Sequence, residues 1–221
     1  AKIWIKPADQ LIPMITEVVG EEIINKLKTN STKGTLIISP HLGNWELVYV
    51  YLARHFSVSA LYSPPKISAL ADLILAGREK LQSGSDDKNG QIIKASKMGV
   101  RKMLRILNNA ELLMVLPDQQ PKEGSGVFAP FYGHQAYTMT LLQGLAQRTD
   151  ANIIMSTCIR NAAGFTLNFS PVDIDNSLSN ELFAEQLNSR MQLEIDKTPE
   201  QYAWAYKRFK IRPDGVPHSY D

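Results

Sequence analysis

The chain has 221 residues, of which 44% are hydrophobic and 21% are charged, and its formal net charge is +2. These values are ordinary for a globular protein with one large domain, and a net charge this small gives no reason to expect nucleic acid as a partner. No apolar stretch reaches the ~20 residues needed to cross a bilayer, and the lone Cys158 cannot form an intrachain disulfide.

Hydrophobic periodicity predicts strands and helices in alternation along the first half of the chain. The expected helices cover 9–28, 45–56, 69–82 and 99–109, with a polar loop over 83–91. The expected strands cover 35–39, 58–62 and 112–116. This alternation indicates an α/β fold, with a central, mostly parallel or mixed sheet flanked by helices.

In the second half, residues 117–134 are rich in Pro and Gly without a clear period, which predicts a long functional loop. A β-hairpin is expected from strands 152–160 and 165–169. The expected helices cover 137–148, 179–197 and 201–209.

A group of polar residues follows the first buried strand. His41 comes just after that strand, where α/β sheets bind their ligands, and Glu46 falls in the first turn of the next helix, which Asn44 is placed to cap. If the loop folds back, the Glu46 carboxylate orients His41 as a general base. From these residues alone, a plain loop histidine and a helix-cap acid stay open as the alternative. A zinc site is disfavoured because no two of the four histidines have ligand spacing.

The segment PHLGNWEL (40–47) resembles the His-x4-Glu motif of the bacterial lipid A secondary acyltransferases, the lauroyl/myristoyl transferase family within the glycerolipid acyltransferase group. Further blocks are similar in the same order: YSPP at 62–65, Arg78 within ILAGREKL, MVLPDQQP at 114–121, GVFAPFYG at 126–133 and PEQYAWAYKRFKIRPDG at 199–215. Tyr132 stands where the family usually has Phe. Members usually carry an N-terminal membrane helix, so we expect one upstream of Ala1, or else a peripheral relative.

The resemblance implies a glycerol-3-phosphate acyltransferase-like fold, with a single acyltransferase domain over 1–221. It implies an O-acyltransferase of lipid A and lipopolysaccharide biosynthesis at the cytoplasmic face of the bacterial inner membrane. Acyl carrier protein would donate the acyl group to a hydroxyl of a lipid A precursor. No metal and no cofactor are expected, since the phosphopantetheine arrives on the carrier. The implied catalytic residues are His41, Glu46, Arg78 and Asp118, with Arg78 as the oxyanion donor.

The implied substrate-binding residues are Asn44, Gln119, Phe128, Phe131, Tyr132, Lys207 and Arg208. The three aromatic side chains line an acyl pocket, meet the bilayer, or pack on the core. The basic and aromatic C-terminus suits an anionic membrane surface, lipid phosphates or an acidic carrier protein, with an ordinary solvated helix face as the alternative. Taken alone, Arg78 is better explained as a solvated helix residue, and for Asp118 a turn-forming residue stays open as the alternative.

Two other functions stay open. One keeps the chemistry but changes the acceptor to another glycolipid, such as a phosphatidylinositol mannoside. The other is a lipid-binding membrane module without turnover. A serine hydrolase is disfavoured, because the sequence has no G-x-S-x-G nucleophile elbow.

Overall fold

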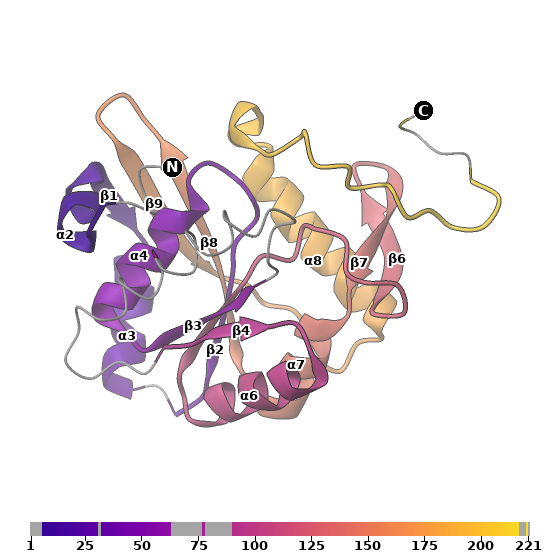
Figure 1. Ribbon diagram of the computed structural model, residues 1–221, viewed down its shortest axis with the longest axis horizontal. Helices are drawn as coiled ribbons and strands as arrows, with labels where there is room; N and C mark the ends of the chain where they lie inside the picture. The colour runs from indigo at the N-terminus through magenta and orange to yellow at the C-terminus, as the bar shows by residue number, and fades with distance from the viewer. Residues whose placement is uncertain (1–5, 31, 63–76, 78–89, 217–219, 221) are drawn as a thin grey trace.

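The computed structural model describes residues 6–30, 32–62, 77, 90–216 and 220, and Figure 1 shows an α/β protein built around one large sheet. The seven strands lie in the order β1-β9-β8-β2-β5-β3-β4. They are β1 (Ile15–Val19), β2 (Thr35–Ile38), β3 (Val58–Tyr62), β4 (Ile92–Lys94), β5 (Leu112–Val115), β8 (Asn152–Arg160) and β9 (Phe165–Pro171). The five strands from β8 to β4 run parallel to one another. Strand β9 is antiparallel to β8, and β1 pairs with β9 in parallel. The expected α/β fold with a mostly parallel, mixed sheet is confirmed.

Helices cover both faces of the sheet, and the strand sequences reflect this. Along β2 every residue is buried: Leu36 and Ile38 enter one apolar cluster, and Ile37 enters the other. Continuous apolar strands of this kind are typical of parallel sheets covered on both sides. The helices are α2 (Ala8–Leu11), α3 (Glu21–Asn30), α4 (Trp45–His55), α6 (Lys97–Asn108), α7 (Leu141–Thr149) and α8 (Asn180–Ile195). Side chains of α4 fill the second cluster, and those of α6, α7 and α8 fill the first.

The expected single helix over 9–28 is wrong. The chain forms α2, a short 3-10 turn (Ile12–Met14), strand β1 and then α3. Gly20 separates the last two, with a φ of +76° that favours glycine. The β-branched residues before it gain backbone hydrogen bonds by pairing with β9 at the sheet edge, which local periodicity does not reveal.

The expected loop over 117–134 and helix over 137–148 are also partly wrong. Strands β6 (Gly126–Phe131) and β7 (His134–Met139) form a separate antiparallel hairpin, and helix α7 begins only at Leu141. Tyr132 and Gly133 connect the strands, both with positive φ. A two-residue turn with two positive φ angles matches the twist of a hairpin.

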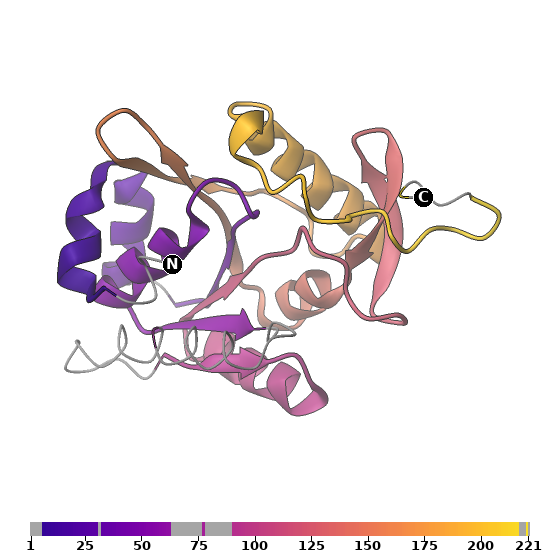
Figure 2. The ribbon, with the colours of Figure 1, turned by 45° about the horizontal axis from the view of Figure 1, so that its top comes forward.

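The expected helix over 201–209 is not formed. A 3-10 turn (Pro199–Gln201) follows α8, and the chain over 202–216 then runs without a helix or strand. We call residues 199–216 the C-terminal strap. Figure 2 shows it leaving α8 and crossing toward the β6-β7 hairpin. Backbone groups of the strap form hydrogen bonds with other segments of the chain. These replace the hydrogen bonds that a helix would have supplied.

The hairpin of β8 and β9 and the helix near 179–197 are confirmed. The helix expected over 69–82 lies outside the described residues except at position 77. Among the described residues, no helix is both long and apolar enough to span a membrane.

Candidate active site

The loop from β2 to α4 carries His41 and is held at both ends. Before it, the Ser39 hydroxyl donates to the carbonyl of Ser156 over 3.0 Å. After it, the Asn44 N–H donates to the carbonyl of Cys158 over 2.7 Å. Gly43 lies between with a φ of +60°, and a Cβ there would approach the Cys158 carbonyl oxygen to 2.1 Å. Only glycine fits this turn, so the backbone around His41 has little freedom.

Asp118 binds His41 at two points. It follows β5, the neighbour of β2, so both residues lie at the carboxyl edge of the sheet. Asp118 Oδ2 accepts from the His41 backbone N–H over 2.8 Å, and Oδ1 lies 2.7 Å from the imidazole Nδ1. The carboxylate is 2% exposed, whereas the His41 side chain is 20% exposed. The imidazole is therefore oriented from the protein interior and reachable from outside.

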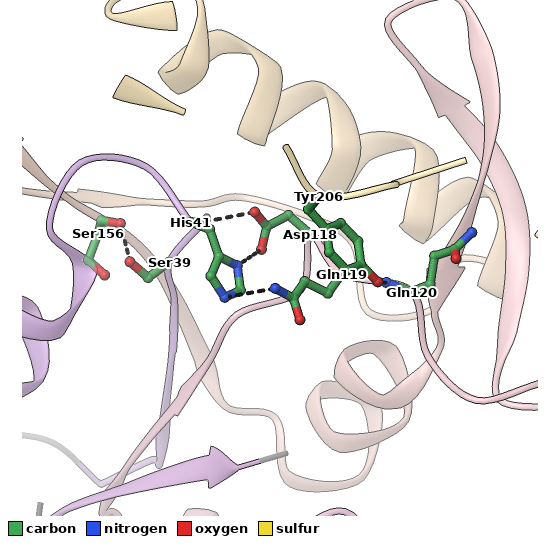
Figure 3. A network of polar contacts seen from close by, with 7 residues as sticks. All are labelled: Ser39, His41, Asp118, Gln119, Gln120, Ser156 and Tyr206. Carbon is green, nitrogen blue, oxygen red and sulfur yellow. Dashed lines mark hydrogen bonds and ion pairs between the residues drawn. The ribbon is translucent and has the colours of Figure 1, made fainter. Parts of the chain in front are cut away.

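Gln119 contacts the other ring nitrogen of His41, with its Nε2 atom 3.2 Å from the imidazole Nε2 (Figure 3). An amide nitrogen only donates, so the imidazole Nε2 is the acceptor, and Nδ1–H donates to Asp118. Both contacts agree with one neutral tautomer, in which Nε2 carries the free lone pair. That tautomer is the one a general base requires.

Glu46 was expected to hold the imidazole, but the carboxylate at Nδ1 belongs to Asp118. Glu46 is buried in the first turn of α4. The residue before it, Trp45, places its ring edge-on to the His41 ring, with centroids 5.4 Å apart. Asn44 is the N-cap residue, but its side chain makes no capping hydrogen bond.

The C-terminal strap adjoins both loops of the site. The Gly43 N–H donates to the carbonyl of Gln201 over 2.9 Å, and the Ala203 N–H donates to the carbonyl of His41 over 3.1 Å. On the other side, the Tyr206 hydroxyl accepts from the Gln120 N–H over 2.9 Å, as Figure 3 shows. Sequence reasoning missed these positioning contacts, and the signal available was the dense aromatic pattern of the strap.

Tyr202 belongs to the same strap and is largely buried. It forms an isolated antiparallel bridge with Leu42, and its ring meets that of Trp204 with centroids 4.8 Å apart. Burial, followed by the nearby charge of Asp118, raises the pKa of the Tyr202 hydroxyl well above its usual range. The hydroxyl therefore stays protonated beside the carboxylate.

The aromatic residues of the β6-β7 hairpin have separate positions. Phe131 is a core residue of the α6-α8 side of the sheet. Tyr132 donates to Asp196 over 2.6 Å, and burial and that carboxylate raise its pKa. Phe128 is partly exposed and packs on Tyr137, with ring centroids 5.2 Å apart. For Phe131 the alternative of packing on the core is the one observed.

Arg208 was expected to bind substrate from the basic C-terminus, but it is 4% exposed. Its guanidinium donates to the Tyr137 carbonyl over 2.7 Å and to the Thr138 hydroxyl over 2.9 Å. Both acceptors lie on β7, so Arg208 fastens the strap to the hairpin. Lys207 is exposed, with its ammonium 5.4 Å from the centroid of the Tyr220 ring.

Arg78 lies outside the described residues. Cys158 is a buried core residue, and burial raises the pKa of its thiol to about 12. Among the described residues, no three His, Cys, Asp or Glu side chains form a group suited to a metal ion.

The fold and the site together define a class of protein: an α/β protein with a histidine held by a buried carboxylate at the carboxyl edge of its sheet. The chain belongs to the bacterial lipid A biosynthesis acyltransferase family, whose model matches residues 1–211. The resemblance seen in the sequence is thereby confirmed.

Curated relatives agree with this family. The chain is 28% identical to a lipid A biosynthesis lauroyltransferase of Escherichia coli K12, over 98% of this chain and 69% of that protein. It is 27% identical to a lipid A biosynthesis acyltransferase of Haemophilus influenzae, over 97% of this chain and 67% of that protein. A lipid A biosynthesis palmitoleoyltransferase of E. coli K12 is 24% identical, over 98% and 68%.

Proposed function

We propose that this protein is an O-acyltransferase that moves a fatty acyl group from an acyl carrier protein thioester to a hydroxyl of a lipid A precursor. The observation that carries the proposal is the His41 imidazole, with Asp118 at Nδ1 and an accepting Nε2 at the carboxyl edge of the sheet. Membership of the family and the names of the relatives support the substrate class. We assign the fold to the glycerolipid acyltransferase group on the same basis.

In the proposed reaction, His41 Nε2 takes the proton from the acceptor hydroxyl as its oxygen bonds to the thioester carbonyl carbon. The imidazolium keeps its Nδ1–H bond to Asp118, which stabilises the new positive charge. The tetrahedral oxyanion then collapses, the carbon–sulfur bond breaks, and His41 returns the proton to the departing thiolate. The products are an ester and a free thiol, so atoms and charge balance.

Three further residues keep proposed roles in this reaction. Gln119 releases His41 Nε2, so that the incoming substrate hydroxyl can bind there, and hydrogen-bonds the acceptor substrate instead. Arg78, proposed from the sequence alone, stabilises the oxyanion. Glu46 is a second buried carboxylate in the first turn of α4, where it would support the acceptor side of the site.

We place the reaction at the cytoplasmic face of the inner membrane. The strap supports this, because Trp204 is 53% exposed and Tyr220 is also exposed, close to the exposed Lys207. Aromatic and basic side chains together favour an anionic interface.

The test is transfer of a labelled acyl chain from acyl carrier protein to a lipid A precursor. His41→Ala should lower turnover by about 10²–10⁴-fold, with an unchanged circular dichroism spectrum. A folded His41→Ala variant with near-normal turnover would remove the base assignment. Wild-type protein that binds the precursor without transfer would indicate the lipid-binding module, and transfer to another glycolipid alone would change the acceptor.

A further inference from the structure

Helix α6 presents an exposed cationic face. Its outward positions are Lys97, Met98, Arg101, Lys102 and Arg105, all exposed and all within two adjoining rows of the helix. We call the four basic residues among them the α6 basic face. Among the described residues, none of these four is ion-paired with a carboxylate, and α6 itself contains no acidic residue.

The basic residues at the N-terminus of α6 oppose the stability of the helix, whereas Arg105 in its last turn favours it. Lys97 stands in the first turn, which has no acidic residue, and Lys94 lies just before the Ser96 cap. Cations at a helix N-terminus face the positive end of the helix dipole, which is unfavourable. A local rule broken at an exposed position, without a compensating anion, is typical of a functional surface.

The face begins beside the catalytic edge of the sheet. Strand β4 runs parallel to β3, β3 to β5, and β5 to β2. Because α6 follows β4, its N-terminus lies at the carboxyl edge, the edge where His41 follows β2. Figure 1 shows α6 at the bottom of the view, away from the strap at the upper right, although both pack on the same apolar cluster.

The composition of the α6 basic face differs from that of the strap. Met98, 71% exposed, is the one large exposed apolar side chain of helix α6, and no aromatic residue belongs to the helix. The strap instead combines the exposed Lys207 and Trp204, and the exposed Tyr220 ring lies beside Lys207. A bilayer interface favours aromatic anchors beside cations, whereas an acidic protein surface needs only opposite charge.

We infer that the α6 basic face is the docking surface for an acidic protein partner, the carrier that delivers the acyl thioester. This rests on the proposed function, in which a protein-bound thioester is the donor. Docking on α6 brings the carrier to the edge of the sheet that holds His41, and leaves the exposed residues of the strap free for the acceptor membrane. The cations steer and retain the carrier without contacting the reacting atoms.

The test uses the full chain with Arg101 and Lys102 both changed to Glu, and Arg190→Glu on α8 as an exposed control. Transfer rates are measured with acyl carrier protein thioester and with the same acyl group on coenzyme A. The double variant should raise KM for the carrier by about tenfold or more with kcat little changed. Its kcat/KM for the coenzyme A thioester should stay the same, and Arg190→Glu should leave both donors unaffected.

An unchanged KM for the carrier, or an equal loss with both donors, overturns the docking assignment. Binding of fluorescent acyl carrier protein, followed by anisotropy, separates this inference from the proposed function. Loss of carrier binding in the double variant, with no transfer by the wild type, would leave docking intact and the proposed reaction refuted. Loss of binding to phosphatidylglycerol vesicles, with carrier binding intact, would make the face a lipid surface and overturn the proposal.

Discussion

Asp118 contacts His41 through both carboxylate oxygens, one on the backbone N–H and one on the imidazole Nδ1. The first contact fixes the position of the His41 backbone, and the second fixes which nitrogen of its ring carries the proton. Replacing a carboxylate that makes both contacts should therefore lower activity more than replacing one that only supplies charge.

Asp118→Asn should therefore lower kcat by about 10³–10⁴-fold, because an amide facing Nδ1 can donate and favours the wrong imidazole tautomer. Steady-state kinetics with thermal unfolding checks this, with the exposed Asp173→Asn as a control of equal chemistry. Glu46→Gln provides the contrast. If Glu46→Gln lowers kcat more than Asp118→Asn does, the carboxylate that orients His41 is Glu46, as the sequence suggested.

Tyr206→Phe removes the acceptor of the Gln120 N–H and leaves the packing of the ring almost unchanged. A partly buried donor without its acceptor costs about 1–3 kcal/mol, and this donor lies two residues after Asp118. We expect kcat to fall while KM for the acyl donor changes little, together with a shifted pH profile of kcat. A variant that only lost thermal stability, with the pH profile intact, would limit Tyr206 to a structural role.

Gly43→Ala should reduce activity severely. The φ of +60° costs a non-glycine residue about 1–2 kcal/mol, and the new Cβ would lie 2.1 Å from the Cys158 carbonyl oxygen, forcing the loop to shift. Gly144→Ala is the matched control, because its Cβ meets nothing within 4 Å inside α7. It should stabilise the protein by up to about 1 kcal/mol with full activity. Equal activity of the two variants would contradict the strained-loop assignment.

Arg208→Met should lower the free energy of unfolding by about 1–3 kcal/mol, because it leaves buried acceptors on β7 without their donor. Urea denaturation checks this. Lys207→Met, at the exposed neighbouring position, should stay within about 0.5 kcal/mol of the wild type. Similar losses at both positions would argue against Arg208 as the residue that fastens the strap.

Much of the sheet follows from local sequence pattern. The short, largely apolar runs of β2 and β5, in which every residue is buried, are typical of strands covered on both faces, so the sequence pattern predicts buried parallel strands. His41 and Asp118 each follow such a run, so their place at the carboxyl edge was also predictable. Strand β1 and the strap were not, because their backbone partners lie far away in the sequence.

The sequence by itself determined the α/β class, the family and the position of His41 after the first buried strand, because those depend on residue type and short-range order. Only the tertiary structure decided that Asp118, 77 residues away, holds the imidazole, and that Arg208 is a buried fastener. Hydrogen-bond partners are set by which segments the packed sheet brings within about 3 Å, and separation along the chain carries no such information.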